Sequence, residues 1–164
     1  MAERDDILDL LAKHRHFLRH TAQGLTDDQA RTRSTVSALT VGGVIKHVTR
    51  VEQRWANFME EGTSAFGTMD EDAYAAHAAS FVMTEDETLA GLLAEYEAVS
   101  ARTDKLIAEL DLDAEYGLPT TPWWPEGMRW SVRRAALHIA AETAQHAGHA
   151  DIVREAIDGQ KTMG

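Results

Sequence analysis

Apolar side chains recur at helical spacing in four segments of the chain, with polar side chains on the opposite faces. The pattern predicts helices from about Asp5 to Ala22, from Val41 to Glu61, from Thr84 to about Leu110, and from Ser131 to near Gly159. In the third segment, Thr84 and Glu87 match a capping box, which predicts where that helix begins. Four amphipathic helices with connectors longer than hairpin turns predict an all-α fold, a four-helix bundle.

The three connectors differ in composition from the helices. Residues 23–39 are rich in Thr, Ser, Asp and Gly without a sustained period, so we expect no regular element there. Residues 63–83 have a poor period, with a short helix predicted around Glu71 to Ala79. Residues 111–130 hold all three prolines and three of the four tryptophans and are predicted to form a loop.

Size and charge limit the class of protein. The 164 residues suit one domain, and we expect residues 1–164 to form a single helical bundle. A net charge of −11 argues against a nucleic-acid partner. No apolar run approaches the roughly 18 residues that a membrane-spanning helix needs, and the N-terminus resembles no secretion signal. The absence of cysteine fits a reducing compartment, so we expect a cytoplasmic protein with no membrane partner.

One face of the last predicted helix carries candidate metal ligands. His138, Glu142, His146 and His149 are spaced by four, four and three residues and share a sector of roughly 80°. Measured from the apolar stripe of that helix, His146 lies closest to the core, followed by Glu142, His149 and His138. We therefore expect burial to fall in that order.

A carboxylate and an imidazole four residues apart can bind one ion from adjacent helical turns. Glu142 and His146 form such a pair, and His47 in the second predicted helix is the candidate third ligand. Two histidines and one carboxylate leave coordination positions for water or substrate. The alternative is that Glu142 and His146 make an ordinary surface contact. His149 is a fourth ligand, a hydrogen-bond partner of the site or a substrate contact, and His138 is a surface residue or a support for the ligands.

Tryptophans supply candidate substrate contacts. Trp123 and Trp124, with Trp130, are placed to form an apolar lip over a pocket, or at least one of them plugs the end of the bundle. We expect Trp55, Trp123 and Trp124 to bind substrate. The other histidines receive no role. The chain has no Gly-rich phosphate loop, no G-x-S-x-G motif and no H-E-x-x-H motif, so phosphoryl transfer and serine-type hydrolysis find no support.

Two stretches carry a resemblance to a known family. LTVGGVIKHVTRVEQRW and MRWSVRRAALHIAAETAQHAGHADIVREAIDG resemble the DinB/YfiT-like superfamily of metalloenzymes, more narrowly an actinobacterial branch of it. In that superfamily the last helix usually carries His-x-x-x-His, and matching this frame places the ligand pair at Glu142 and His146. The similar mycothiol-dependent maleylpyruvate isomerases have the same glutamate in place of the first histidine.

The resemblance implies a four-helix bundle that holds a divalent metal, zinc or nickel, at His47, Glu142 and His146. It also implies a low-molecular-weight thiol such as mycothiol as cosubstrate. We therefore expect a metal-dependent thiol S-transferase or isomerase that acts on a small electrophile. The alternatives are a metal-dependent hydrolase and a non-catalytic stress protein that binds a metal or a small molecule. The resemblance further implies a possible homodimer.

Overall fold

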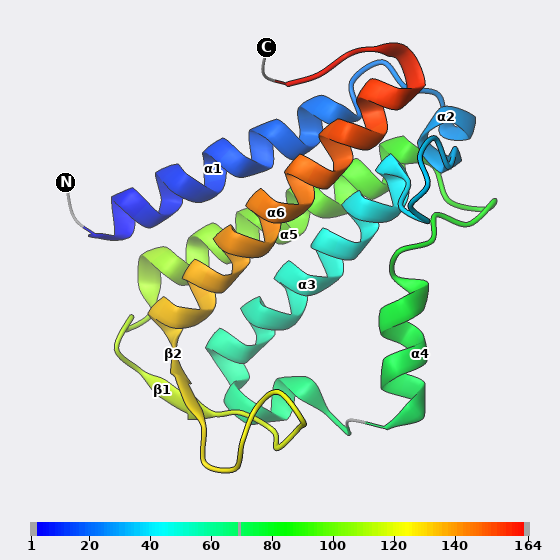
Figure 1. Ribbon diagram of the computed structural model, residues 1–164. Coiled ribbons are helices and arrows are strands. Elements are labelled where there is room, and N and C mark those ends of the chain that lie inside the picture. The colour runs from blue at the N-terminus through cyan, green and yellow to red at the C-terminus, as the bar shows by residue number, and fades with distance from the viewer. Residues whose placement is uncertain (1–2, 69, 163–164) are drawn as a thin grey trace.

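Four long helices run side by side in the computed structural model, which describes residues 3–68 and 70–162 (Figure 1). They are α1 (Glu3–Thr21), α3 (Val41–Glu61), α5 (Leu89–Glu109) and α6 (Val132–Asp158). Helix α6 packs against α1 and α3, and α3 also packs against α5. The predicted four-helix bundle with long connectors is therefore confirmed.

Side-chain caps explain where the two helices that carry the candidate ligands begin. The hydroxyl of Thr40 accepts a hydrogen bond from the amide of Gly43 at the start of α3, and the hydroxyl of Ser131 does the same at the start of α6. Helix α6 ends at Gly159, whose φ of 79° lies in the left-handed region that glycine adopts readily. These local signals determine where α3 and α6 begin and where α6 ends.

The predicted start of the third long helix was wrong. Residues 84–87 form a turn, and Thr88 is the N-cap of α5, with its hydroxyl accepting from the amide of Gly91. A carboxylate oxygen of Asp27, 62 residues away in sequence, accepts a second amide hydrogen bond at 2.7 Å from Leu89. The side chain of Glu87 does accept a hydrogen bond at 2.8 Å from the amide of Thr84, as in a capping box, and it also forms an ion pair with Lys46 of α3, but residues 84–87 do not continue as a helix. The local cap of Thr88 and a tertiary contact with Asp27 thus both mark the start of α5.

The connectors contain more regular structure than their sequences indicate. The predicted short helix α4 (Glu71–Ala79) is present. The connector of residues 23–39, where no regular element was expected, contains the short helix α2 (Asp27–Arg31), and a 3-10 helix η1 (Gly62–Phe66) follows α3. The prediction of a loop over residues 111–130 was wrong in part, because this stretch contains β1 (Glu115–Gly117) and most of β2 (Arg129–Ser131), which pair antiparallel with Tyr116 opposite Trp130. Each strand has three residues, too few to give a clear alternation.

A buried polar layer divides the core into two apolar clusters. One cluster surrounds Trp55 near the hairpin, and the other surrounds Tyr96 near α2. Between them along the helices lie Arg15, Glu52, Thr103 and Thr143, all buried. The Arg15 guanidinium pairs with Glu52 at 2.5 Å and with Asp104 at 2.6 Å, which compensates the burial of these charges.

In the described ranges, no helix combines the length and the apolar character needed to cross a membrane.

Candidate metal centre

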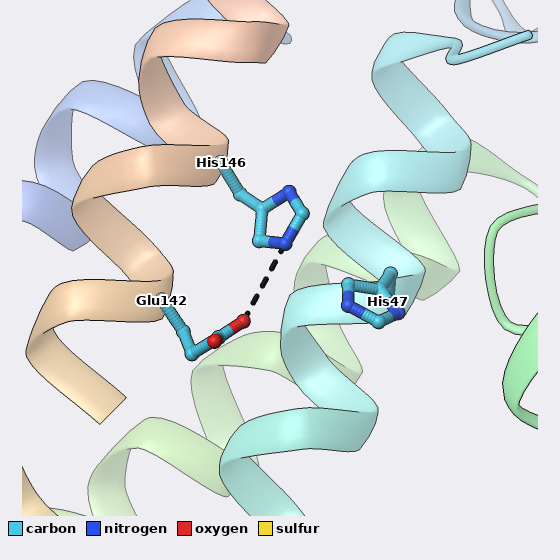
Figure 2. Close-up of side chains that lie close together, drawn as sticks. All are labelled: His47, Glu142 and His146. Carbon is cyan, nitrogen blue, oxygen red and sulfur yellow. Dashed lines mark ion pairs between the residues drawn. The ribbon is translucent and has the colours of Figure 1, made fainter. Parts of the chain in front are cut away.

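The three predicted ligands come together where α3 faces α6. One donor atom each from His47, Glu142 and His146 lie within 4.8 Å of one another. Figure 2 shows His47 approaching from α3, while Glu142 and His146 approach from successive turns of α6. Two imidazoles and a carboxylate are a donor set that suits a divalent transition metal. The residues present therefore fit such an ion.

The pair on α6 has the geometry that its four-residue spacing predicts. His146 Nε2 lies 3.5 Å from Glu142 Oε2, as the dashed line in Figure 2 marks. The hydrogen bond from His146 lowers the pKa of Glu142, so this side chain is an anionic carboxylate at neutral pH. Both side chains are partly exposed, at 12% for His146 and 27% for Glu142. The pair therefore presents its donor atoms at the edge of the core.

His47 is buried, with 3% of the residue exposed, and its ring is held by Ser80 at the end of α4. The Ser80 hydroxyl donates its one proton to the carbonyl oxygen of His77 at 2.6 Å. At its 2.8 Å contact with His47 Nδ1, Ser80 Oγ must therefore accept, and Nδ1 must carry the ring proton. In neutral His47 the Nε2 lone pair is then free for a metal.

The electrostatic surroundings keep His47 neutral. Burial, together with the nearby His146 and His77, lowers the pKa of His47 to about 4. The ring of Phe81 stacks on the His47 ring, with centroids 3.6 Å apart and planes 15° apart. Phe81 comes this close because α3 carries Gly43 beside it, where a Cβ would lie 2.0 Å from the Phe81 carbonyl oxygen. Ser80 and Phe81 thus fix both the position and the tautomer of His47.

His149 lies behind His146 rather than among the three donors. Its Nδ1 is 3.4 Å from Nδ1 of His146, while His146 Nε2 faces Glu142. Among the described residues the candidate metal cluster comprises only His47, Glu142 and His146. His149 thus contacts a candidate ligand, and its role stays a prediction.

The expected burial order on α6 was wrong for His138. Its side chain is 24% exposed, slightly less than the 27% of Glu142. The reason is tertiary: the rings of Trp55 and Trp130 pack edge-on against the imidazole, with centroids 4.8 and 5.2 Å away. His138 Nε2 also lies 3.7 Å from Glu142 Oε1. His138 therefore lies beside the carboxylate oxygen that His146 does not contact.

A cavity of about 580 Å³ opens beside the three donors. His47 and Glu142 lie in its wall, and the three tryptophans expected to contact substrate, Trp55, Trp123 and Trp124, line it as well. Trp130 does not line it; its ring stacks on Trp55 within the core, at a centroid distance of 4.7 Å. The lip is thus formed by Trp123 and Trp124, and Trp130 fills the end of the bundle.

Sequence reasoning missed several residues around this cavity. Ser80 and Phe81 follow the short helix α4, and Tyr74 of that helix meets Trp123 with ring centroids 6.1 Å apart. Arg54 of α3 also lines the cavity. No spacing rule marks these positions, because α4 is placed by contacts with residues far away in the sequence. For Arg54 a signal existed, its position seven residues after His47 on the same helix face.

The family model described as Mycothiol-S-transferase matches residues 6–159. The chain belongs to the mycothiol-S-transferase family. The fold of this mycothiol-S-transferase family member is similar to that in a crystal structure described as the conserved protein of locus from Enterococcus faecalis, with a TM-score of 0.70. That chain is 15% identical, and the similarity covers 98% of this chain and 99% of the other. Among curated proteins there is no significant match.

Proposed function

We propose that this protein is a divalent-metal-dependent S-transferase that attaches mycothiol, or a similar low-molecular-weight thiol, to a small electrophile. Family membership supports the thiol chemistry. The structural observation that carries the proposal is the location of His47 and Glu142 in the wall of an aromatic cavity, with His146 within 4.8 Å of both. A metal held there would face a space large enough for two small reactants.

His47 and His146 would each supply an imidazole nitrogen and Glu142 a carboxylate oxygen. Three protein donors leave room for a further ligand, as catalytic sites require. A zinc or nickel ion bound there would lower the pKa of the thiol, so that the thiolate forms near neutral pH. The protein itself has no cysteine, so the reacting sulfur comes from the cosubstrate.

The cavity walls position the electrophile. Trp55, Trp123 and Trp124 offer large apolar faces that bind the body of a small molecule and exclude water. In the transfer, the thiol loses its proton to solvent and its sulfur forms a bond to the electrophilic carbon. The leaving group departs with the electron pair of the broken bond. With an unsaturated electrophile, addition of sulfur, rotation about the new single bond and expulsion of the thiolate would give isomerisation.

The proposal is tested with metal-loaded protein, mycothiol and 1-chloro-2,4-dinitrobenzene. Transfer forms a carbon–sulfur bond, releases chloride and is followed by the absorbance of the thioether. We expect turnover that depends on both metal and thiol, with mycothiol preferred over glutathione and coenzyme A. His146→Ala and chelator-treated protein should fall to the background rate.

Two other outcomes identify the alternatives. Release of chloride with formation of the phenol in the absence of thiol would indicate a metal-dependent hydrolase. Stoichiometric metal without turnover of any electrophile in a broad panel would indicate a non-catalytic binding protein.

We also propose that the protein acts in the cytoplasm, where small thiols are kept reduced. Homodimer formation remains a prediction from the family resemblance. Analytical ultracentrifugation tests it, and a single monomeric species at micromolar concentration would exclude it.

A further inference from the structure

We propose that Arg54 binds a carboxylate, so that the substrate of this pocket is a small carboxylic acid with an apolar or aromatic body. The inference rests on the proposed function only in taking the cavity beside the metal centre as the substrate site. It adds the chemical class of the electrophile.

Three basic side chains of α3 line the cavity at intervals of four residues, namely Lys46, Arg50 and Arg54. Two of them are neutralised by glutamates of the connector and of α5. Lys46 Nζ lies 2.8 Å from an oxygen of Glu87, and Arg50 Nη1 lies 2.8 Å from Glu95. They are therefore already committed to structural ion pairs.

Arg54 differs from both, because no carboxylate, carbonyl or aromatic ring of the described residues pairs with it. The residue as a whole is half-buried. Among the described residues that line the cavity, Glu142 is the one acidic side chain, and it is engaged by His138 and His146. An anionic ligand would supply the missing partner.

The position of Arg54 suits recognition of one end of a ligand. It lies seven residues after His47, about 10 Å along the helix axis. Its charge still acts at the metal centre, where it contributes to the lowered pKa of His47. A ligand held by its carboxylate at Arg54 would direct its other end toward His47.

Much of the remaining cavity wall is aromatic. Trp55, Phe66, Tyr74 and Trp124 line the same cavity, so the middle of the ligand meets aromatic faces. This surface favours an aromatic or extended apolar body over a sugar or a polyol. Guanidinium at one end and aromatic rings along the walls together select an aryl or alkyl carboxylate.

Isothermal titration calorimetry on the full-length, metal-free protein tests the inference. The probes are 3-phenylpropanoate and its uncharged counterpart 3-phenylpropanamide. We expect wild type to bind the acid at least about tenfold more tightly than the amide, because a charge-assisted hydrogen bond is lost with the amide. Arg54→Gln should abolish this preference, and Arg54→Lys should retain part of it. Arg50→Gln is the matched control, since Arg50 lines the same cavity but is already paired, and it should keep the preference.

Equal affinity for acid and amide in wild type would overturn the inference, as would a preference for the acid that survives in Arg54→Gln. Failure of both probes to bind at millimolar concentration would also overturn it. Circular dichroism of each variant establishes that the fold is intact. Because the assay contains neither thiol nor metal, it can succeed where thiol transfer fails. Conversely, thiol transfer to uncharged electrophiles alone would leave the proposed function standing and this inference overturned.

Discussion

Ser80 Oγ lies 2.8 Å from His47 Nδ1 and accepts a hydrogen bond from its N–H, because the Ser80 hydroxyl already donates to the His77 carbonyl oxygen. A ligand histidine needs its unprotonated nitrogen directed at the metal, and the hydrogen bond at the other nitrogen selects that tautomer. Ser80, at the end of α4, therefore leaves Nε2 of His47 on α3 unprotonated and free to bind a metal. This relationship couples a short connector helix to the chemistry of the bundle.

Removal of this hydrogen bond should weaken metal binding without abolishing it. We expect Ser80→Ala to lower the affinity for zinc about 10- to 100-fold, the usual effect of losing a group that orients a ligand. Chelator competition measures the affinity. Ser64→Ala is the control, since the Ser64 hydroxyl bonds only the nearby Glu61 carbonyl oxygen. Unchanged zinc affinity in Ser80→Ala would show that the hydrogen bond does not prepare the ligand.

The stoichiometry of metal binding separates ligands from neighbours. Elemental analysis of wild type should give one divalent ion per chain, and His47→Ala or His146→Ala should contain none, with helical content unchanged. His149→Ala should still bind one ion, because His149 contacts His146 rather than the donor cluster. Retention of stoichiometric metal in both the His47 and His146 variants would reject the cluster. Loss of metal in His149→Ala would make His149 a fourth ligand.

Acid should destabilise the metal-free protein through His47. Its pKa is about 4 when folded, against 6.5 as the ordinary value, so the unfolded chain binds the proton more readily. The contribution of neutral His47 to the unfolding free energy is therefore complete above pH 6.5 and is lost as the pH falls toward 4. Over that window the loss is roughly 3 kcal/mol of unfolding free energy. Urea unfolding across the window should show a shallower decline for His47→Gln than for wild type.

The control for this pH series is His16→Gln, which alters an exposed histidine of α1. Its stability should decline in parallel with that of wild type. Parallel curves for wild type and His47→Gln would mean that His47 does not couple folding to pH.

Gly43 is needed for the approach of the α4–α5 connector to α3. A Cβ there would lie 2.0 Å from the Phe81 carbonyl oxygen, so Gly43→Ala must displace that backbone. We expect a loss of roughly 1–3 kcal/mol in unfolding free energy, together with weaker metal binding, because Phe81 stacks on His47.

Gly148→Ala is the matched helical control. It is exposed, a Cβ there meets no heavy atom within 4 Å, and it should stabilise α6 by up to about 1 kcal/mol. Equal stability of Gly43→Ala and wild type would contradict the close approach.

The four long helices and the Glu142–His146 pair of the candidate site could be predicted from the amino-acid sequence. The apolar period predicts α1, α3, α5 and α6, since each helix buries one face along its length. Glu142 and His146 meet because residues four apart lie on adjacent turns of any α-helix. For these features the decisive interactions are local, so periodicity and caps suffice.

Only the tertiary structure decided the rest. The amide of Leu89, at the start of α5, donates to Asp27, 62 residues earlier, a contact that adds to the local cap of Thr88. The environment of His138 depends on two tryptophans, one from α3 and one from β2. The tautomer of His47 depends on Ser80, and the unpaired state of Arg54 depends on where acidic side chains of other elements lie. The sequence alone determined the four long helices and the placement of Glu142 and His146 on adjacent turns of one face, because a helix repeats every 3.6 residues wherever it lies. Hydrogen bonds and ion pairs between distant segments follow no such period, because they depend on how the helices and connectors pack against one another.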